Sequence, residues 1–389
     1  MSGRSPVGGT TASRSDADLP LPSIAADLVG WQRIHGRHGL PWQGSRDPYR
    51  VWLSEVMLQQ TQVTTVLGYF DRFLQRFPDV AALAAAPVDD VLALWSGLGY
   101  YSRANNLHRC ARAVVSDHGG AFPRRASELI SLPGIGPSTA AAIASFCFGE
   151  RVSIFDGNVK RVLARLLAFD GDLAQAASAK VLWAQADRLV PADAADMPAY
   201  TQGLMDLGAT VCKPRDPDCT ACPLQKSCRA WARATVSTYP VKTRKLKRSR
   251  RENWCLWLSV GDVVWLQQRP AGGIWAGLWA WPLIDDPAAV DQVTAQLLTG
   301  LGAVGDQLQA RRLPSFLHVL THLDWTLHPC RLELPASAVM VAREPGTGDP
   351  LARLDAVLTT ALGPGRWFAS TQWPDLGLPA PLRRHLLGV

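Results

Sequence analysis

Two carboxylates stand in sequence contexts that suit acid–base chemistry. Glu55 lies in "SEVMLQQTQ" beside Met57 and Leu58, and apolar neighbours favour the protonated form of a carboxyl group. Asp156, in "SIFDGNVKRVLARLLA", is placed to cap the next helix, where backbone amides and the helix dipole favour the anion. A proton donor and a fixed anion are what cleavage of a glycosidic bond requires. Glu55 could equally be an ordinary residue on a helix surface, and Asp156 a simple helix cap. The two carboxylates alone therefore do not establish this chemistry.

Four cysteines form a second candidate site. Cys212, Cys219, Cys222 and Cys228 follow the spacing Cys-x6-Cys-x2-Cys-x5-Cys within 17 residues, which allows four thiolates to enclose one metal centre. Structural zinc usually uses two Cys-x2-Cys arms, and only one is present here. The compact loop therefore favours a [4Fe–4S] cluster, with zinc as the alternative. Disulfides are disfavoured because the chain shows no export signal.

A third feature is the glycine-rich break "LPGIGPSTAAA". Gly134 and Gly136 lie between two helix-like segments, and the second helix opens with Ser138. Glycine permits positive φ and lets backbone amides approach a phosphate, and the following helix N-terminus adds a favourable dipole. The pattern predicts a helix-hairpin-helix element that anchors a DNA backbone without reading its sequence. A tight helix connection without DNA contact is the alternative.

The elements that carry these residues divide the chain. Helical periodicity covers about 22–235, with helices expected at 66–77, 88–95, 102–118, 125–131, 138–148, 157–168, 177–189 and 198–209. Beyond residue 251 the texture changes: "WCLWLSVGDVVWLQQRP" and "FLHVLTHLDWTLHPCRLELP" alternate as β-hairpins do, and nine of the 15 Trp lie there. We expect a tail at 1–21, a helical domain at 22–235, a linker at 236–252 and an α+β domain at 253–389.

The composition fits a two-domain globular protein. The chain has 389 residues, 47% of them hydrophobic, and no apolar run long enough to cross a bilayer. Its net charge of +7 resides in "KTRKLKRSRR" at 242–251, which holds seven basic residues and no acid. This run is either a solvated hinge or a tether along phosphates. The Ser/Gly/Thr-rich first 20 residues do not resemble a secretory signal, so we expect a cytoplasmic, nucleoid-associated protein.

Together these motifs resemble the MutY-type adenine DNA glycosylases of the helix-hairpin-helix superfamily. The resemblance covers roughly 25–385 and rests on "LPW", "YRVWLSEVMLQQTQV", "LWSGLGYYSRANNLH", "LPGIGPSTAAAI", "DGNVKRVLAR", "MDLGATVC", the cysteine spacing, "RPAGGIWAGLWAWP" and "LGLPAPLRRHL". It implies an N-terminal all-α helix-hairpin-helix glycosylase domain with an iron–sulfur cluster loop, followed by a C-terminal α+β Nudix-like domain. It also implies a [4Fe–4S] cluster rather than zinc, and removal of adenine mispaired with 8-oxoguanine or guanine.

The resemblance assigns roles position by position. Glu55 is similar to the catalytic acid that protonates adenine at ring nitrogen 7, and Asp156 to the anion that stabilises the sugar cation. Asn158 and Gln202 match residues that hold the extruded adenine. Trp42 and Leu58 match walls of the pocket around it, and Gln60 and Tyr100 match residues that wedge into the duplex. Trp95 and Leu98 are interpreted as packing residues.

Ser138 distinguishes the chain from the related endonuclease III type. In that family a lysine at this turn attacks the sugar, forms a Schiff base and nicks the strand. A serine without an adjacent base is a poor nucleophile. The resemblance therefore implies a monofunctional glycosylase that leaves an abasic site. Lys160 is interpreted as a helix cation near phosphate.

The C-terminal domain resembles a Nudix-like domain that recognises 8-oxoguanine. Nudix hydrolases hold magnesium with clustered Glu residues, and "LIDDPAAVDQVTAQLLTGLG" contains none, so we expect no nucleotide hydrolysis. The family's Phe-Ser-His-type loop corresponds here to Leu320-Thr321-His322. Thr321 keeps a hydroxyl and His322 is retained, whereas Leu320 replaces the aromatic ring.

The partner implied by the resemblance is double-stranded DNA with an adenine mispair. A sliding clamp and an abasic-site endonuclease are further family-level partners, although no motif establishes either. We expect a monomer and no membrane association. The competing hypotheses are an enzyme acting on thymine or uracil opposite guanine, and a damage-binding protein without catalysis.

Overall fold

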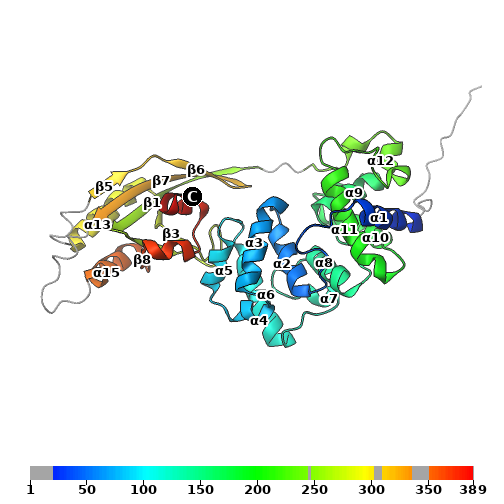
Figure 1. The fold of residues 1–389 in the computed structure, drawn as a ribbon. Helices are drawn as coiled ribbons and strands as arrows, with labels where there is room; N and C mark the ends of the chain where they lie inside the picture. Colours follow the sequence, from blue (N-terminus) through cyan, green and yellow to red (C-terminus); the bar gives the residue numbers. More distant parts are fainter. Residues whose placement is uncertain (1–20, 244–246, 302–308, 335–349, 389) are drawn as a thin grey trace, which may run out of the picture. The chain divides into compact units, whose positions relative to one another are not determined.

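The computed structural model describes residues 21–243, 247–301, 309–334 and 350–388 (Figure 1). By its contacts the chain divides into two compact units. The first unit comprises the described residues of 1–52, 123–131 and 135–244, and the second comprises those of 53–122, 132–134 and 245–389. The tail expected at 1–21 falls almost entirely outside the described residues.

The first unit is helical. α9 (Gly157–Leu166) lies at its centre, with Val159, Val162, Leu163 and Leu166 buried in the main core at the spacing of one helix face. α1 (Leu21–His35) packs against α11 (Met197–Asp206). The other elements are α7 (Ala126–Leu129), α8 (Pro137–Phe148), α10 (Ala176–Asp187), a π-helical turn (Leu207–Val211), α12 (Arg229–Ala232) and the short 3₁₀ turns Ala194–Asp196, Gln225–Ser227 and Val236–Thr238.

The second unit begins with four helices that follow α2 (Pro48–Leu58), a helix that crosses from one unit to the other. They are α3 (Val63–Arg76), α4 (Val80–Ala85), α5 (Val88–Trp95) and α6 (Ser102–His118). Their core contains Phe73, whose ring meets Trp95 edge-on with the centroids 6.1 Å apart. The expected helices are present within a few residues; α4, capped by Asp79, was not expected because six residues are too few for a periodic pattern.

A mixed sheet forms the rest of the second unit. Its strand order is β3-β2-β1-β7-β5, with β4 on β1, β6 on β7 and β8 on β2. The strands are β1 (Ser249–Val260), β2 (Val263–Gln268), β3 (Trp279–Ala280), β4 (Leu283–Ile284), β5 (Gln309–Arg312), β6 (Phe316–Val319), β7 (Leu323–Leu334) and β8 (Arg366–Ala369). Both expected hairpins are confirmed: β1 pairs antiparallel with β2, and β6 with β7. β1 begins at Ser249, inside the range 236–252 that was expected to be a linker, because its first residues pair in parallel with β7.

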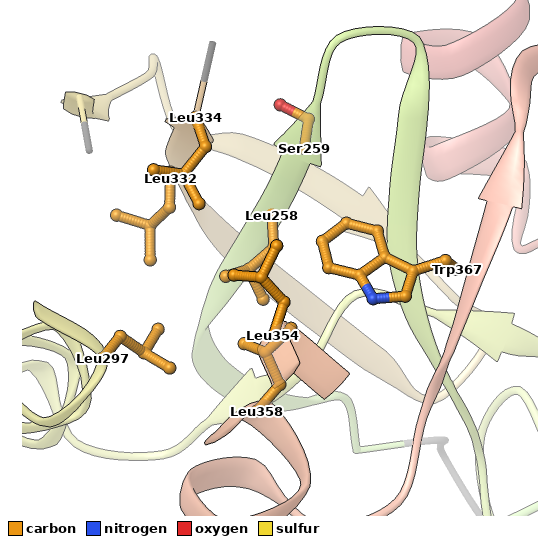
Figure 2. Close-up of a pocket in the computed structure, with 8 residues that line it drawn as sticks. All are labelled: Leu258, Ser259, Leu297, Leu332, Leu334, Leu354, Leu358 and Trp367. Carbon is orange, nitrogen blue, oxygen red and sulfur yellow. The ribbon is translucent and has the colours of Figure 1, made fainter. Parts of the chain in front are cut away.

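Helices cover one face of this sheet with apolar side chains. Figure 2 shows leucines of β1 and β7 facing Leu297 of α13 (Pro287–Leu301), Leu354 and Leu358 of α15 (Pro350–Leu362), and Trp367 of β8. These side chains surround a small cavity of about 10 Å³. A cavity of this size, lined mainly by leucines, is a packing defect of the core and not a nucleotide site.

The end of the chain packs on the helices of the same unit. The segment before α16 (Ala380–Leu387) places the Leu378 carbonyl where Ser96 Oγ and Tyr101 Oη donate to it, at 2.9 and 3.3 Å. Asn105 Nδ2 donates to the Ala276 carbonyl at 3.2 Å. These contacts attach the sheet domain to α5 and α6. No helix among the described residues is long and apolar enough to span a membrane.

Candidate functional site

Asp156 caps α9 as predicted. Its Oδ1 accepts a hydrogen bond from the Val159 amide at 2.7 Å, so the carboxylate is held at the positive end of the helix. The preceding residue, Phe155, donates its amide to Ser138 Oγ at 3.2 Å. Ser138 is therefore engaged at the base of the loop that carries Asp156.

Asn158 is oriented by an arginine that the sequence analysis missed. Arg161 Nη2 donates to Asn158 Oδ1 at 2.9 Å and to the Gly208 carbonyl at 2.6 Å, and its Nε donates to the Cys212 carbonyl at 2.8 Å. Burial lowers the pKa of the Arg161 guanidinium below its usual value. One guanidinium thus joins the start of α9 to the first cysteine. The signal in the sequence was a pair of arginines, Arg161 and Arg165, four apart on a helix with an apolar face.

Gln202 and Trp42 are the other predicted adenine contacts in the first unit. Gln202 Nε2 donates to Asp206 Oδ1 at 2.8 Å, and Asp206 also holds Arg37. Trp42 is buried in the loop after α1, with 8% of its surface exposed. Asp206 could not be predicted from the sequence, because a lone Asp near a helix end resembles an ordinary surface residue.

Glu55 lies on α2 among buried neighbours. It is half-buried, and Ser54, Val56 and Met57 around it are buried. The end of α2 is held by Arg103, whose Nη1 donates to the Val56 and Met57 carbonyls at 2.8 Å each. Burial lowers the pKa of Arg103 to about 10. Glu55 belongs to the second unit and Asp156 to the first, so their joint action is a matter for proposal.

The two predicted wedge residues share an uncommon backbone conformation. Gln60 has φ +58° and Tyr100 has φ +48°, and both side chains are exposed. Positive φ at a non-glycine residue is strained and concentrates at functional positions. Leu58, a predicted pocket wall, lies half-buried two residues before Gln60. The residue types at these two positions do not indicate this strain.

The loop predicted to probe 8-oxoguanine contacts one of those wedges. The hydroxyls of Tyr100 and Thr321 are hydrogen-bonded to each other within the second unit. The loop itself is held by β1: the Ser249 amide donates to the His322 carbonyl at 3.0 Å, and Arg248 Nη2 donates to the Leu320 carbonyl at 2.9 Å. His322 and Thr321 are exposed. Two predicted recognition residues far apart in the chain are thereby brought together.

The hairpin requires its first glycine. Gly134 has φ +76°, and a Cβ there would lie 2.5 Å from Asn106 Cβ. Gly136 is the N-cap of α8 and is exposed, and Pro137 occupies the first turn, where a missing amide costs nothing. Exposed backbone at a helix N-terminus suits an anionic group such as a phosphate.

All four clustered cysteines line one pocket. Its other walls include Arg165, Val211 and Trp231. Arg165 Nη1 donates to Cys212 Sγ at 3.3 Å, and Cys228 Sγ donates to the Arg165 carbonyl at 3.5 Å. Burial raises the pKa of the Cys222 thiol to about 12 and raises that of Cys219 and Cys228.

Four thiols around a common, largely apolar pocket are a donor set that fits a thiolate-bound metal group. Within the part of the chain that the structure describes, no three His, Cys, Asp or Glu side chains stand close enough to hold a single ion. The fit is therefore one of donor chemistry and shared lining.

The fold and these sites define a class. Residues 53–185 match the HhH-GPD superfamily of base excision DNA repair proteins, and residues 253–387 match the NUDIX domain. The chain is a base excision DNA repair enzyme of helix-hairpin-helix type joined to a Nudix-like domain.

Similar proteins of known name identify the family within this class. The chain is 34% identical over 359 residues to the adenine DNA glycosylase of Buchnera aphidicola subsp. Schizaphis graminum, covering 92% of this chain and 96% of that one. The adenine DNA glycosylases of Mus musculus and Homo sapiens are 36% and 34% identical, covering 72% and 70% of their lengths and 82% and 84% of this chain. The chain belongs to the adenine DNA glycosylase family, and the predicted resemblance is confirmed. A solved thermostable thymine-DNA glycosylase shares the helical fold, with a TM-score of 0.50 and 28% identity, over 55% of this chain and 97% of that one.

Proposed function

We propose that the enzyme excises adenine mispaired with 8-oxoguanine or guanine in duplex DNA and leaves an abasic site. Membership in the adenine DNA glycosylase family supports the base that is removed. The Tyr100–Thr321 contact supports the choice of opposite base, because it joins a wedge residue to the recognition loop. Leu320 lacks an aromatic ring, so Thr321 and His322 are the loop residues to which we assign recognition.

Chemistry starts after the adenine has rotated out of the stack. The Glu55 carboxyl protonates ring nitrogen 7, and the C1′–N9 bond breaks with its electron pair leaving on adenine. The Asp156 carboxylate stabilises the sugar cation that remains. Water then adds at C1′ while the Glu55 carboxylate takes its proton, which restores the acid. Asn158 and Gln202 hold the base, and Trp42 and Leu58 enclose it.

The single observation that supports monofunctional chemistry is the environment of Ser138. Its oxygen accepts the Phe155 amide, and no amine stands at this position. Lys160 is the nearest amine along the chain, and its ammonium lies over the Phe155 ring at 4.9 Å from the centroid. This contact accounts for the position of the Lys160 side chain without a role in attack on the sugar.

Cys212, Cys219, Cys222 and Cys228 would hold a [4Fe–4S] cluster. The cluster would supply structural cross-linking of the loop and of the DNA-facing surface near it. Arg165, which contacts both a cysteine sulfur and the chain around it, keeps that loop against α9.

The remaining assignments follow the family. Gly134 and Gly136 anchor a DNA backbone, and Gln60 wedges beside the opposite base. The Nudix-like domain recognises the lesion and does not hydrolyse nucleotides, since α13 carries no Glu. The proposed domains are 22–235 and 253–389, joined by the stretch 236–252, in which the residues from Ser249 onward belong to β1, and the enzyme acts as a cytoplasmic monomer.

Single-turnover cleavage of end-labelled duplexes tests the proposal. Adenine opposite 8-oxoguanine, adenine opposite guanine and thymine opposite guanine are compared, and half of each time point is treated with alkali. Strand breaks at adenine only after alkali are expected, and Glu55→Gln should abolish them while DNA binding persists. Breaks without alkali would refute the monofunctional assignment. Release of thymine instead of adenine, or binding without any release, would refute the substrate.

A further inference from the structure

Asp206, at the end of α11, is a buried carboxylate that the proposed chemistry does not use. None of its surface is exposed. Its Oδ2 accepts the Arg37 amide at 2.9 Å, and its Oδ1 accepts Arg37 Nε at 2.7 Å and Gln202 Nε2 at 2.8 Å. Removing a charge from water is costly unless it is paired, and these three donors provide the pairing. All partners lie in the first unit.

This network decides which way the amide of Gln202 points. An ionised carboxylate can only accept hydrogen bonds, so the Gln202 side chain must present its NH₂ group to Asp206. Gln202 lies one helical turn before Asp206, so the two side chains share a helix face. The amide oxygen, Oε1, is consequently turned away from Asp206 and offers an acceptor.

An acceptor at this position has a chemical meaning for purines. Adenine carries a donor at its 6-amino group, whereas guanine carries an acceptor, O6, at the same ring position. An outward Oε1 pairs with the first and repels the second. An outward NH₂ group would do the reverse.

We propose that Asp206, together with Arg37, is a positioning pair that fixes the Gln202 amide so that its oxygen accepts a hydrogen bond from the 6-amino group of the extruded adenine. The proposal rests on the proposed function, because it deepens the account of adenine selection at the same site.

Arg37 links the loop that bears Trp42 to the same carboxylate. The chain turns sharply after α1, where the Gly36 amide donates to the Gln32 carbonyl at 2.9 Å and a Cβ on Gly36 would lie 2.5 Å from that oxygen. Arg37 follows this turn and binds Asp206 through backbone and side chain, five residues before Trp42. Asp206 therefore holds both the predicted adenine contact and the start of the loop that bears the predicted pocket wall.

The test compares two substrates in the same duplex opposite 8-oxoguanine: adenine, and purine, which lacks the 6-amino group. In Asp206→Asn only one oxygen remains for three donors, and the NH₂ group that replaces the other oxygen opposes a donor of Arg37 in either orientation, so the Gln202 amide is no longer held in one orientation. The single-turnover rate on adenine should fall about tenfold, the loss expected for one hydrogen bond to a buried group, while the rate on purine stays within about twofold. The ratio of the two rates therefore falls about tenfold.

Two further variants make the result decisive. Gln202→Leu keeps the buried carboxylate and its arginine, and should lower the same ratio about as much. Adding Asp206→Asn to it should lower the ratio no further. Arg33→Gln is the matched control, because it breaks the exposed 2.6 Å ion pair between Arg33 on α1 and Asp196 at the start of α11 and should leave both rates unchanged.

The outcomes are distinguishable. If Asp206→Asn lowers both rates equally, or if Gln202→Leu keeps the wild-type ratio, the positioning proposal is overturned. The rate ratio of Gln202→Leu tests the proposal even if Asp206→Asn does not fold. If the wild-type enzyme releases no adenine from either mispair, the proposed function itself fails. This release is measured before any variant is made, so the two failures are separate.

Discussion

Gly208 offers the sharpest test of how the start of α9 is held. It is buried in the π-helical turn before Cys212, and a Cβ there would lie 2.7 Å from Asn158 Cβ and 3.2 Å from the Asn158 backbone carbon and oxygen. Carbon atoms pack best at about 3.5–4.0 Å, so Gly208→Ala requires a movement of about 1 Å. The obstructing atoms belong to a helix N-terminus and cannot rotate away.

The magnitude follows from two opposed effects. Overpacking of this kind costs about 1–3 kcal/mol, and replacing a helical glycine by alanine returns up to about 1 kcal/mol. Because the obstructing atoms cannot rotate away, the cost lies at the upper end of its range, about 2–3 kcal/mol, and the net destabilisation is about 1–2 kcal/mol, or about 2–8 °C in the apparent melting temperature. The displaced residue follows Asp156 by two positions and carries the 2.9 Å bond to Arg161. A misplacement of this size at reacting groups can lower the rate about a hundredfold, so we expect adenine release to fall by that order.

Thermal unfolding followed by circular dichroism and single-turnover release from an adenine·8-oxoguanine duplex are the two assays. Gly30→Ala is the control: it lies exposed on α1 of the same unit with nothing within 4 Å of its Cβ position, and it should raise stability by up to about 1 kcal/mol. A Gly208→Ala enzyme that is as stable and as active as the wild type would refute this reasoning.

Three other expectations are open to direct measurement. Ser138→Lys should create an amine beside the sugar and give a borohydride-trapped enzyme–DNA adduct; absence of a trapped band would place this position away from the sugar. Cys222→Ser should lose iron and visible absorption, with about four iron atoms bound per wild-type chain, while Cys147→Ser should keep both; equal iron content in the two variants would count against the cysteine cluster. His318 packs on Trp275 and Trp325, and burial lowers its pKa below 6.5. Below pH 6.5 the unfolded chain therefore binds a proton at His318 more readily than the native state does. The contribution to the free energy of unfolding that is present above pH 6.5 is lost as the pH falls below it. His318→Gln should flatten this dependence of the melting temperature between pH 7.5 and 5, and an unchanged slope would contradict it.

Much of this protein was readable from local sequence. The Asp156 cap depends on an amide three residues away, and the two hairpins depend on alternation around a short turn. The four cysteines line one pocket because a 17-residue loop leaves them little freedom to separate. Each of these features involves neighbours in the chain, so residue type and spacing were enough to predict it.

The tertiary structure alone decided the contacts that span the chain. Asp206 meets Arg37 across 169 residues, Arg161 meets Cys212 across 51, and Tyr100 meets Thr321 across 221. Helical periodicity alone groups 22–235 as one domain, yet the helices of 53–122 cluster with the C-terminal sheet, through contacts such as the hydrogen bond from Ser96 to the Leu378 carbonyl. Such pairings are selected by burial and by the need to satisfy every buried polar group, and both conditions exist only once the whole chain has packed. The sequence by itself determined the chemistry that the residues can perform, and packing decided which distant side chains orient those residues.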